Sequence, residues 1–273
     1  MTNLSASAGF ACTLVVALAG CVVTPYEAQP APADSPPATY QSADQASEPP
    51  PPLPVYEQPP CPEEGYIWTP GVWRWGPQGY FWVPGTWVAP PEAGMLWTPG
   101  YWGFAGAVYV FHPGYWGRHV GYYGGINYGH GYTGEGYAGG RWEGGRFRYN
   151  TAVTNVNTTI IHNTYNETVI NNVNTNVTRV SHVGAPGTRA QPTRTETVFA
   201  REPRAVPTPS QLEHHNTALT SPPQYAARNE GRPPVAATPH ANAFTEHGVT
   251  AAKPVGPAYH PQQPPRRPDK PQH

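Results

Sequence analysis

Gly65-Tyr-Ile-Trp-Thr-Pro-Gly-Val-Trp73 is the first of four related phrases that lie between residues 65 and 116. In each phrase, two aromatic residues flank a central Pro-Gly pair. Successive copies are offset by 14, 15 and 14 residues, and so regular a spacing indicates a duplicated structural unit. The other copies are Gly79-Tyr-Phe-Trp-Val-Pro-Gly-Thr-Trp87, Gly94-Met-Leu-Trp-Thr-Pro-Gly-Tyr-Trp102 and the looser Phe111-His-Pro-Gly-Tyr-Trp116.

The Pro-Gly pair at the centre of each phrase has the chemistry of a tight turn. Proline presets φ at the first central position, and glycine accepts the positive φ that a type II turn requires at the second. We therefore predict that each pair bends a short hairpin and that its two flanking Trp residues face one another. Short strands between such turns predict a small antiparallel meander, so the fold class is mostly β combined with disorder. The predicted turn residues are Pro70, Gly71, Pro84, Gly85, Pro99 and Gly100.

The predicted sheet needs a cover, because both of its faces are apolar. Period-two alternation places the Trp side chains on one face and smaller apolar side chains such as Val72 and Val83 on the other. The Gly/Tyr-rich segment 117–150 follows the repeats and contains 12 Gly interspersed with aromatic residues. We predict that this segment orders in part against the sheet, and a flexible glycine loop is the alternative.

The amino-terminal residues 1–20 have the features of an export signal. The apolar run Phe10–Ala19 is too short to span a bilayer but suits the core of a signal peptide. It ends in Leu18-Ala-Gly-Cys21, which resembles a bacterial lipobox. That resemblance implies cleavage before Cys21 and acylation of its thiol. Because no Asp follows Cys21, it also implies the outer membrane of a Gram-negative bacterium.

Residues 21–64 are predicted to form an acidic, proline-rich tether. Thirteen prolines lie between Thr24 and Pro62, and the carboxylates from Pro25 to Glu64 are accompanied by no Lys or Arg. Such a composition favours an extended, semi-rigid chain without a core of its own. The tether would separate a lipid anchor at Cys21 from the repeat region 65–116.

The carboxyl-terminal half has two further compositions. In the Asn/Thr-rich segment 151–183, the spacing of apolar residues suggests a helix, whereas Asn, Thr and Val favour strands or irregular chain; we prefer the second and leave the helix open. Residues 184–273 are rich in Pro, Ala, Thr and His and are predicted to be disordered. The exception is a helical turn at 209–217, where Ser210-Gln-Leu-Glu213 fits a capping box.

The reactive side chains form no recognisable catalytic pattern. Cys61 is interpreted as an unpaired thiol, since processing would leave no intrachain disulfide framework. The 11 His lack the close pairing of a metal-binding helix, and the carboxylates of residues 65–183 fit no motif. We therefore predict no catalytic residue, no metal and no cofactor, and we do not expect an enzyme. A net charge of −1 argues against nucleic acid as a partner.

The three intact phrases place this chain beside a known repeat. Trp68-Thr-Pro-Gly-Val-Trp73, Trp82-Val-Pro-Gly-Thr-Trp87 and Trp97-Thr-Pro-Gly-Tyr-Trp102 resemble the WXXGXW or YXWGXW repeat of a family of bacterial lipoproteins. The Gly/Tyr block that begins at His119 is also similar to that family. The resemblance covers about residues 65–183. It implies an envelope location and a repeat architecture, and it carries no established activity.

From these features we expect a membrane-anchored envelope lipoprotein with a non-catalytic structural or protein-interaction role. Carbohydrate binding, to peptidoglycan or an exopolysaccharide, is an alternative, because flat aromatic rings stack on sugar faces. Self-assembly through the Asn/Thr-rich segment is a weaker alternative. A stacking role competes with the interpretation that the Trp side chains form the core. The candidate stacking residues are Trp68, Trp73, Trp82, Trp87, Trp97 and Trp102.

Overall fold

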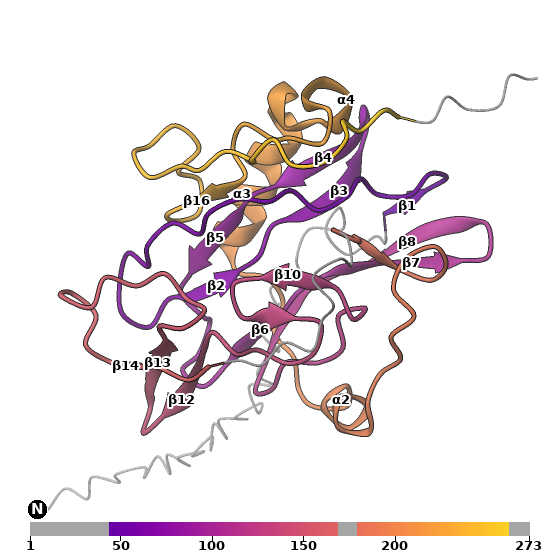
Figure 1. The fold of residues 1–273 in the computed structure, drawn as a ribbon. Coiled ribbons are helices and arrows are strands. Elements are labelled where there is room, and N and C mark those ends of the chain that lie inside the picture. Colours follow the sequence, from indigo (N-terminus) through magenta and orange to yellow (C-terminus); the bar gives the residue numbers. More distant parts are fainter. Residues whose placement is uncertain (1–43, 169–178, 262–273) are drawn as a thin grey trace, which may run out of the picture. The chain divides into compact units, whose positions relative to one another are not determined.

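The computed structural model describes residues 44–168 and 179–261 (Figure 1). The predicted signal peptide, the predicted lipidation site Cys21 and the first part of the predicted tether lie outside the described residues. So do residues 169–178 and 262–273. Within the described residues, short strands outnumber helices, which confirms the mostly β prediction. No helix in this part of the chain combines the length and apolar character needed to cross a bilayer.

The first two phrases build one long antiparallel hairpin. The inner strands β3 (Val72–Gly76) and β4 (Gly79–Val83) pair around a turn at Pro77-Gln78, and the outer strands β2 (Ile67–Thr69) and β5 (Gly85–Val88) pair with each other. The register is the same on both sides of the Pro-Gly positions. Trp68 therefore faces Trp87 and Trp73 faces Trp82, with ring centroids 5.3 Å and 5.1 Å apart.

The last two phrases build a second hairpin on the same plan. Strands β7 (Tyr101–Ala105) and β8 (Val108–His112) form its inner part, and β6 (Leu96–Thr98) and β9 (Tyr115–Gly117) form its outer part. Trp97 faces Trp116 and Trp102 faces Phe111, both at 5.3 Å. Phe111 thus fills the place of a Trp in the fourth copy. The four aromatic pairs are geometrically equivalent and meet edge to face or tilted.

The predicted role of the Pro-Gly pairs is wrong. The Pro70-Gly71 and Pro84-Gly85 pairs lie opposite one another within the first hairpin, where they join consecutive strands instead of bending them into hairpins. Neither these glycines nor Gly100 has the positive φ of a type II turn. Antiparallel hairpins are confirmed, but the nested pairing of β2 with β5 replaces the predicted meander.

Glycine is present at these positions because a partner aromatic ring lies directly on the backbone. A Cβ at Gly71 would overlap the Trp82 indole, and one at Gly85 would lie 2.6 Å from Trp68. The second hairpin repeats this arrangement, with Phe111 on Gly100 and Trp97 on Gly114. In each hairpin, the first aromatic residue of one phrase therefore packs on the glycine of the other phrase.

Residues 44–64, the described part of the predicted tether, pack on the folded chain, so the prediction of a free tether is wrong for them. All of their prolines lie in residues 49–62. We call residues 49–62 the strap. Ahead of it, β1 (Gln45–Ala46) pairs with β8. The strap has no regular secondary structure and lies against the Trp side chains. The Nε1 atoms of Trp73 and Trp87 donate to the carbonyls of Pro52 and Pro59, at 3.3 Å and 2.9 Å.

The Gly/Tyr-rich segment also packs on the hairpins, as predicted. It contains the short pair β10 (Asn127–Gly129) and β11 (Tyr132–Thr133), followed by the hairpin of β12 (Gly140–Glu143) and β13 (Arg146–Asn150). The buried Tyr132 hydroxyl lies 3.2 Å from the Trp68 carbonyl and 2.8 Å from that of Trp97. One tyrosine therefore bridges equivalent positions of the two hairpins.

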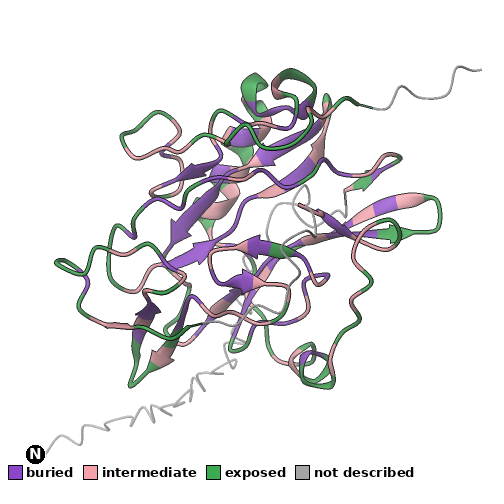
Figure 2. Cartoon of the chain, in the orientation of Figure 1, coloured by how far each residue is buried: buried purple, intermediate pink, exposed green. Residues whose placement is uncertain are grey.

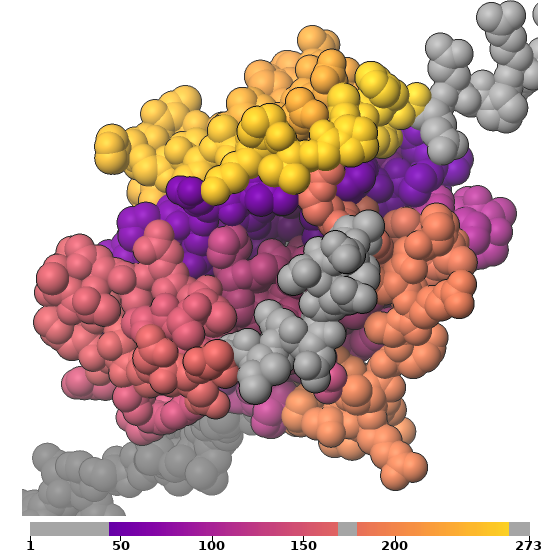
Figure 3. Space-filling view, in the orientation of Figure 1, coloured from indigo at the N-terminus to yellow at the C-terminus, as the bar shows by residue number. Residues whose placement is uncertain are grey.

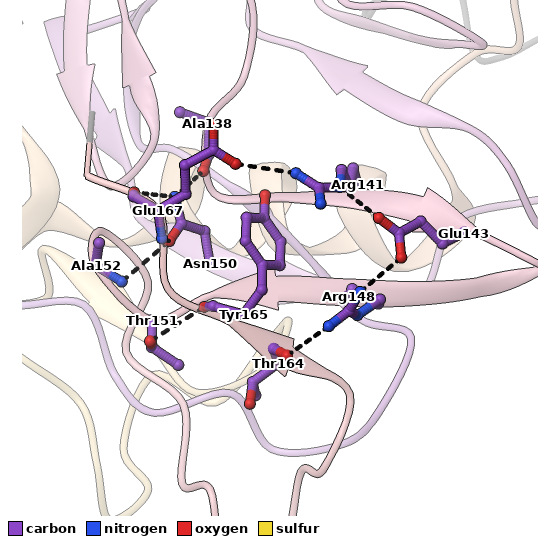
Figure 4. Close-up of polar contacts among 10 residues, drawn as sticks. All are labelled: Ala138, Arg141, Glu143, Arg148, Asn150, Thr151, Ala152, Thr164, Tyr165 and Glu167. Carbon is purple, nitrogen blue, oxygen red and sulfur yellow. Dashed lines mark hydrogen bonds and ion pairs between the residues drawn. The ribbon is translucent and has the colours of Figure 1, made fainter. Parts of the chain in front are cut away.

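The described part of the Asn/Thr-rich segment is irregular chain and short strand. Strand β14 (Thr164–Tyr165) pairs parallel with β13, and β15 (His182–Val183) pairs parallel with β7. Figure 4 shows how side chains hold β14: the Asn150 amide donates to the carbonyls of Ala138 and Glu167, and Arg148 donates to that of Thr164. The alternative helix rests on the spacing of Ile170, Val173, Val177 and Val180. The first three lie outside the described residues, and Val180 lies in irregular chain.

Residues 184–261 are ordered, so the prediction of a disordered tail is wrong for them. They form α2 (Arg194–Phe199), α3 (Pro209–Thr220), the short helices η1 (Pro222–Gln224) and α4 (Ala226–Asn229), and β16 (Ala237–Thr238), which pairs parallel with β5. Figure 3 shows the last part of this chain, in yellow, lying against the first described residues, in indigo. The predicted helix at 209–217 is confirmed as α3, but its capping box uses Thr208 and Gln211.

Candidate functional site

The six Trp residues proposed for sugar stacking form the core of the described chain. Their exposed fractions are 6% or less, and the side chains of Trp68 and Trp87 are fully buried. Figure 2 shows the same distribution, with buried residues concentrated on the strands of the first hairpin. A buried ring has no face to offer a sugar, so a stacking surface made of Trp68, Trp73, Trp82, Trp87, Trp97 and Trp102 is not present in this structure.

Backbone carbonyls from other segments fix several of the buried indoles. Besides the two bonds to the strap, Trp82 Nε1 donates to the Ala236 carbonyl at 2.9 Å, and Trp102 Nε1 donates to the Trp73 carbonyl at 2.8 Å. Most buried polar groups in proteins are hydrogen-bonded, because an unpaired one costs free energy, so these bonds help to determine where the covering segments lie. The Trp residues are therefore structural.

The faces opposite the Trp side chains differ between the two hairpins. In the first hairpin this face carries Phe81, which packs against Ala218 of α3 and against Tyr225 in a small buried cluster. In the second hairpin the equivalent face carries Tyr101 and His112, and His112 is exposed. The second hairpin thus presents an aromatic surface that α3 does not cover.

This surface lines a groove between the second hairpin and the chain around α2. Two adjoining depressions, of about 410 Å³ and 560 Å³, share Tyr101 and His112 in their walls. We call both together the aromatic groove. Its hairpin side also contains Gly103 and Val110. Its other lining residues include Pro99, Pro113, Tyr115, Tyr122, Val183, Thr188, Arg189, Pro192, Glu196, Thr197 and Arg204.

The rings of the groove hold one another in fixed orientations. Tyr101 and His112 stack with centroids 4.5 Å apart and an angle of 13° between their planes, and Tyr122 meets Tyr101 edge to face at 5.3 Å. The Tyr122 hydroxyl donates to the Ala190 carbonyl at 2.7 Å. The Arg204 guanidinium lies 4.0 Å from the centre of the Tyr115 ring. Preformed aromatic surfaces of this kind are typical of binding sites.

The groove is electrically neutral on its floor and cationic at its rim. Desolvation by the neighbouring chain lowers the pKa of His112 and raises the pKa of Tyr101 to about 12, so both rings are uncharged at neutral pH. Arg189 and Arg204 supply positive charge. The Glu196 carboxylate is the only acidic group of the lining, and it accepts hydrogen bonds from Thr193 at the start of α2.

Two other polar clusters are structural. Glu143 pairs with Arg141 and Arg148 on the exposed face of the β12–β13 hairpin, and Arg141 also reaches Glu167 and stacks on Tyr165, as Figure 4 shows. Exposed pairs of this kind contribute little free energy. A cavity of about 50 Å³ beneath α3 has room for little more than water.

The remaining reactive groups are dispersed. Across residues 44–168 and 179–261, no three His, Cys, Asp or Glu side chains come together in a way that could hold a metal ion. Cys61 is buried and unpaired; burial raises the pKa of its thiol to about 11, and the thiol donates to the Glu63 carbonyl. The burial of Cys61 also opposes a disulfide between chains.

Sequence reasoning missed the aromatic groove, although the repeat contains its signal. The residue between the glycine and the second Trp of each phrase points away from the Trp face. It is Val72 and Thr86 in the first hairpin but Tyr101 and Tyr115 in the second. Two large rings at this position indicate a surface that differs from the one that α3 covers.

Comparison with known proteins identifies the hairpins as a described repeat. The WXXGXW repeat family matches this chain twice, at residues 65–88 and 93–116. Each match covers one hairpin, apart from Gly117 at the end of the second, so the repeating unit contains two of the phrases. No curated protein and no solved structure showed a significant match to this chain.

Proposed function

We propose that this chain, which carries two WXXGXW repeats, is an exported and lipid-anchored envelope protein whose folded part is a non-catalytic module that binds extended polypeptide segments. The aromatic groove is the observation that carries the proposal. Its half-buried rings, Tyr101, Tyr115 and Tyr122, are preorganised and open to a ligand. Proline-rich chains dock in aromatic-lined grooves because their backbone is already extended and little entropy is lost on binding.

The fold already contains such contacts within its own chain. The strap lies on the Trp face of the first hairpin, where indole N–H groups donate to the carbonyls of Pro52 and Pro59. A third indole, that of Trp82, donates to Ala236 just after the Pro233-Pro234 pair. Aromatic side chains of the repeat therefore bind proline-rich segments twice, and this supports the same chemistry for the open groove.

The lipid anchor is proposed from the sequence Leu18-Ala-Gly-Cys21. Replacing Cys21 with Ser should abolish incorporation of labelled palmitate and move the protein from the membrane fraction to the soluble fraction. Continued labelling of Cys21→Ser would overturn this part of the proposal. Membrane association without labelling would also overturn it.

Binding in the groove is tested with the soluble full chain and two immobilised probes, an acidic proline-rich peptide and an insoluble glycan. We expect retention on the peptide, and we expect Tyr115→Ala to weaken it at least tenfold, since aromatic contact area would be lost. The control Tyr165→Ala alters an aromatic residue of the β12–β14 sheet, outside the groove, and should bind normally.

Retention on the glycan alone, lost in Tyr115→Ala, would replace the proposal by carbohydrate binding in the same groove. Peptide retention that is unchanged in Tyr115→Ala would refute the assignment of the groove. Thermal unfolding of each variant distinguishes a lost contact from a lost fold.

A further inference from the structure

We infer that the aromatic groove is occupied by residues 22–43 of the same chain, the proline-rich segment that precedes the described structure. This inference rests on the proposed function and names the partner of the same groove. Three independent observations support it: the place where the described chain begins, the charge of the groove, and the way in which the neighbouring strap is bound.

The first described residue lies next to the groove. Strand β1 runs antiparallel to β8, with Gln45 opposite Val110, and the Phe111 N–H donates to the Asp44 carbonyl at 2.9 Å. Val110 and His112 both line the groove. A chain that continues backwards from Asp44 along β8 therefore passes His112 and Pro113 and reaches the rings within a few residues.

Asp44 is held firmly at this point. Its carboxylate accepts from the buried Arg74 guanidinium at 2.5 Å and from the backbone N–H of Trp75 at 3.3 Å. Because this anchor fixes both the position and the direction of the chain, the preceding residues have a high effective concentration at the groove. Docking such a segment costs less entropy than binding a separate molecule.

The charge of the groove selects this segment over the other terminal segment. Residues 22–43 carry Glu27 and Asp34 with no Lys or Arg, which complements Arg189 and Arg204 at the rim. Residues 262–273 are also proline-rich, but they contain three basic residues and one Asp. Their positive charge would meet the cationic rim unfavourably.

The chemistry of residues 22–43 matches that of the strap. The segment contains five prolines, including the pair Pro36-Pro37, and Tyr40 follows shortly after. The strap shows that proline-rich chain of this protein packs on the aromatic rings of the repeat. If Cys21 is acylated, docking would shorten the distance between the membrane and the folded part, so that the groove side faces the bilayer.

The test uses the soluble full chain with a photoactivatable p-benzoylphenylalanine in place of Thr197, an exposed residue of the groove wall. We expect a crosslink within the chain to peptides from residues 22–43. A probe in place of Arg146, in the exposed β12–β13 hairpin, is the matched control and should give little of this product.

Two sets of substitutions separate docking from chance collision. Arg204→Ala removes the complementary charge, and the double change Pro36→Gly and Pro37→Gly removes the extended backbone. Each should lower the yield of the crosslink at least fivefold without changing the thermal midpoint. Equal yields in these variants, a crosslink to residues 262–273, or a crosslink between two chains would overturn the inference.

A chain with Gly and Ser in place of residues 22–43 distinguishes failure of this inference from failure of the proposed function. If the groove is vacated, this chain should bind the immobilised proline-rich peptide several-fold more tightly than the natural chain. Equal binding by both chains would overturn cis occupancy while the proposed function stands. Absence of peptide binding by both would overturn the two together.

Discussion

At the residue scale, the WXXGXW pattern describes reciprocal packing between two copies. The first aromatic residue of each phrase lies on the glycine of the other phrase in the same hairpin, as Trp82 does on Gly71 and Trp68 does on Gly85. The second Trp of each copy faces the first aromatic residue of its partner across the ladder. The two aromatic residues and the glycine therefore pack as a single unit. This is a physical reason for the fixed spacing of the three residues in the sequence.

Gly71→Ala should destabilise the protein strongly. Its Cβ would overlap the Trp82 indole, which is buried and cannot move aside. Overpacking of a core costs about 1–3 kcal/mol and sometimes more, so we expect a loss of roughly 3 kcal/mol in the free energy of unfolding. Urea denaturation followed by Trp fluorescence measures it.

Gly117→Ala is the matched control. Gly117 is likewise a buried glycine of a repeat hairpin, but its added Cβ would come no closer than 3.3 Å to another residue. It should cost clearly less than Gly71→Ala. Similar losses of stability in both variants would show that the local backbone preference for glycine, and not contact with the ring, determines the requirement for glycine.

The pH dependence of stability should reflect buried histidines, and His214 is the clearest case. Its Nε2–H donates to the Pro84 carbonyl, and its Nδ1 accepts from the Asn242 N–H, both at 3.0 Å. Burial lowers its pKa to about 4, and the pKa values of His130 and His215 fall to about 4 and 3. The unfolded chain binds these protons more readily. Stability should therefore be full above about pH 6.5 and fall as the pH drops towards 4.

His214→Gln removes one of these groups and should flatten the decline. The lowering of the His214 pKa to about 4 corresponds to a contribution on the order of 3 kcal/mol to the pH dependence of the free energy of unfolding. The measurement is the free energy of unfolding at several pH values between 7 and 4, with His162→Gln, an exposed position, as the control. An unchanged slope in His214→Gln would contradict the assignment, whatever its stability at pH 7.

Much of the residue pattern could be predicted from the sequence, but the role of glycine could not. The aromatic residues are recognisable as a repeat, and their competing interpretation as core is the one that the burial of Trp68 and Trp87 supports. Pro-Gly, however, suits both a turn and a site of close approach. Only the sign of φ and the position of the partner ring distinguish the two, and neither is encoded locally.

At the element scale, the strands exist because each long hairpin pairs with itself in one continuous register. The Pro-Gly positions interrupt the ladder without shifting it, so side chains keep the same face on both sides of the break. Sequence periodicity predicted the strands well. The partner of each outer strand could not be predicted, because nested pairing and a meander place the same residues on the same faces.

Helix α3 should depend on its first residues more than on its interior. The Thr208 hydroxyl accepts from the Gln211 N–H, and the Gln211 side chain accepts from the Thr208 N–H, which completes a capping box. Thr208→Ala should cost about 1 kcal/mol of stability. Ser210→Ala alters the residue that the sequence pattern suggested and should be nearly neutral. A larger loss for Ser210→Ala would contradict this cap.

At the scale of the whole molecule, segments without a core of their own complete one aromatic core. Three segments pack on the hairpins: the strap, the Gly/Tyr-rich segment and the carboxyl-terminal chain. Each of them contributes polar groups or small side chains to the Trp face of a hairpin or to its opposite face. Composition predicted disorder for the first and the last, because Pro, Ala and His bury little apolar area by themselves. Their order comes from docking on Trp rings, which a composition taken segment by segment does not reveal.

The carboxyl-terminal chain should therefore be required for stability. Deleting residues 184–273 would remove β16 from the edge of β5, the Ala236 carbonyl from Trp82, and α3 from Phe81. The exposed apolar face and the unpaired indole N–H each carry a free-energy cost. We expect the truncated chain to unfold at a much lower temperature or to aggregate, with loss of the near-ultraviolet circular dichroism of the Trp residues. Deleting residues 262–273 alone removes none of these contacts and is the control. A truncated chain that keeps the thermal midpoint and the Trp signal of the full chain would show that the hairpins form their core without this cover.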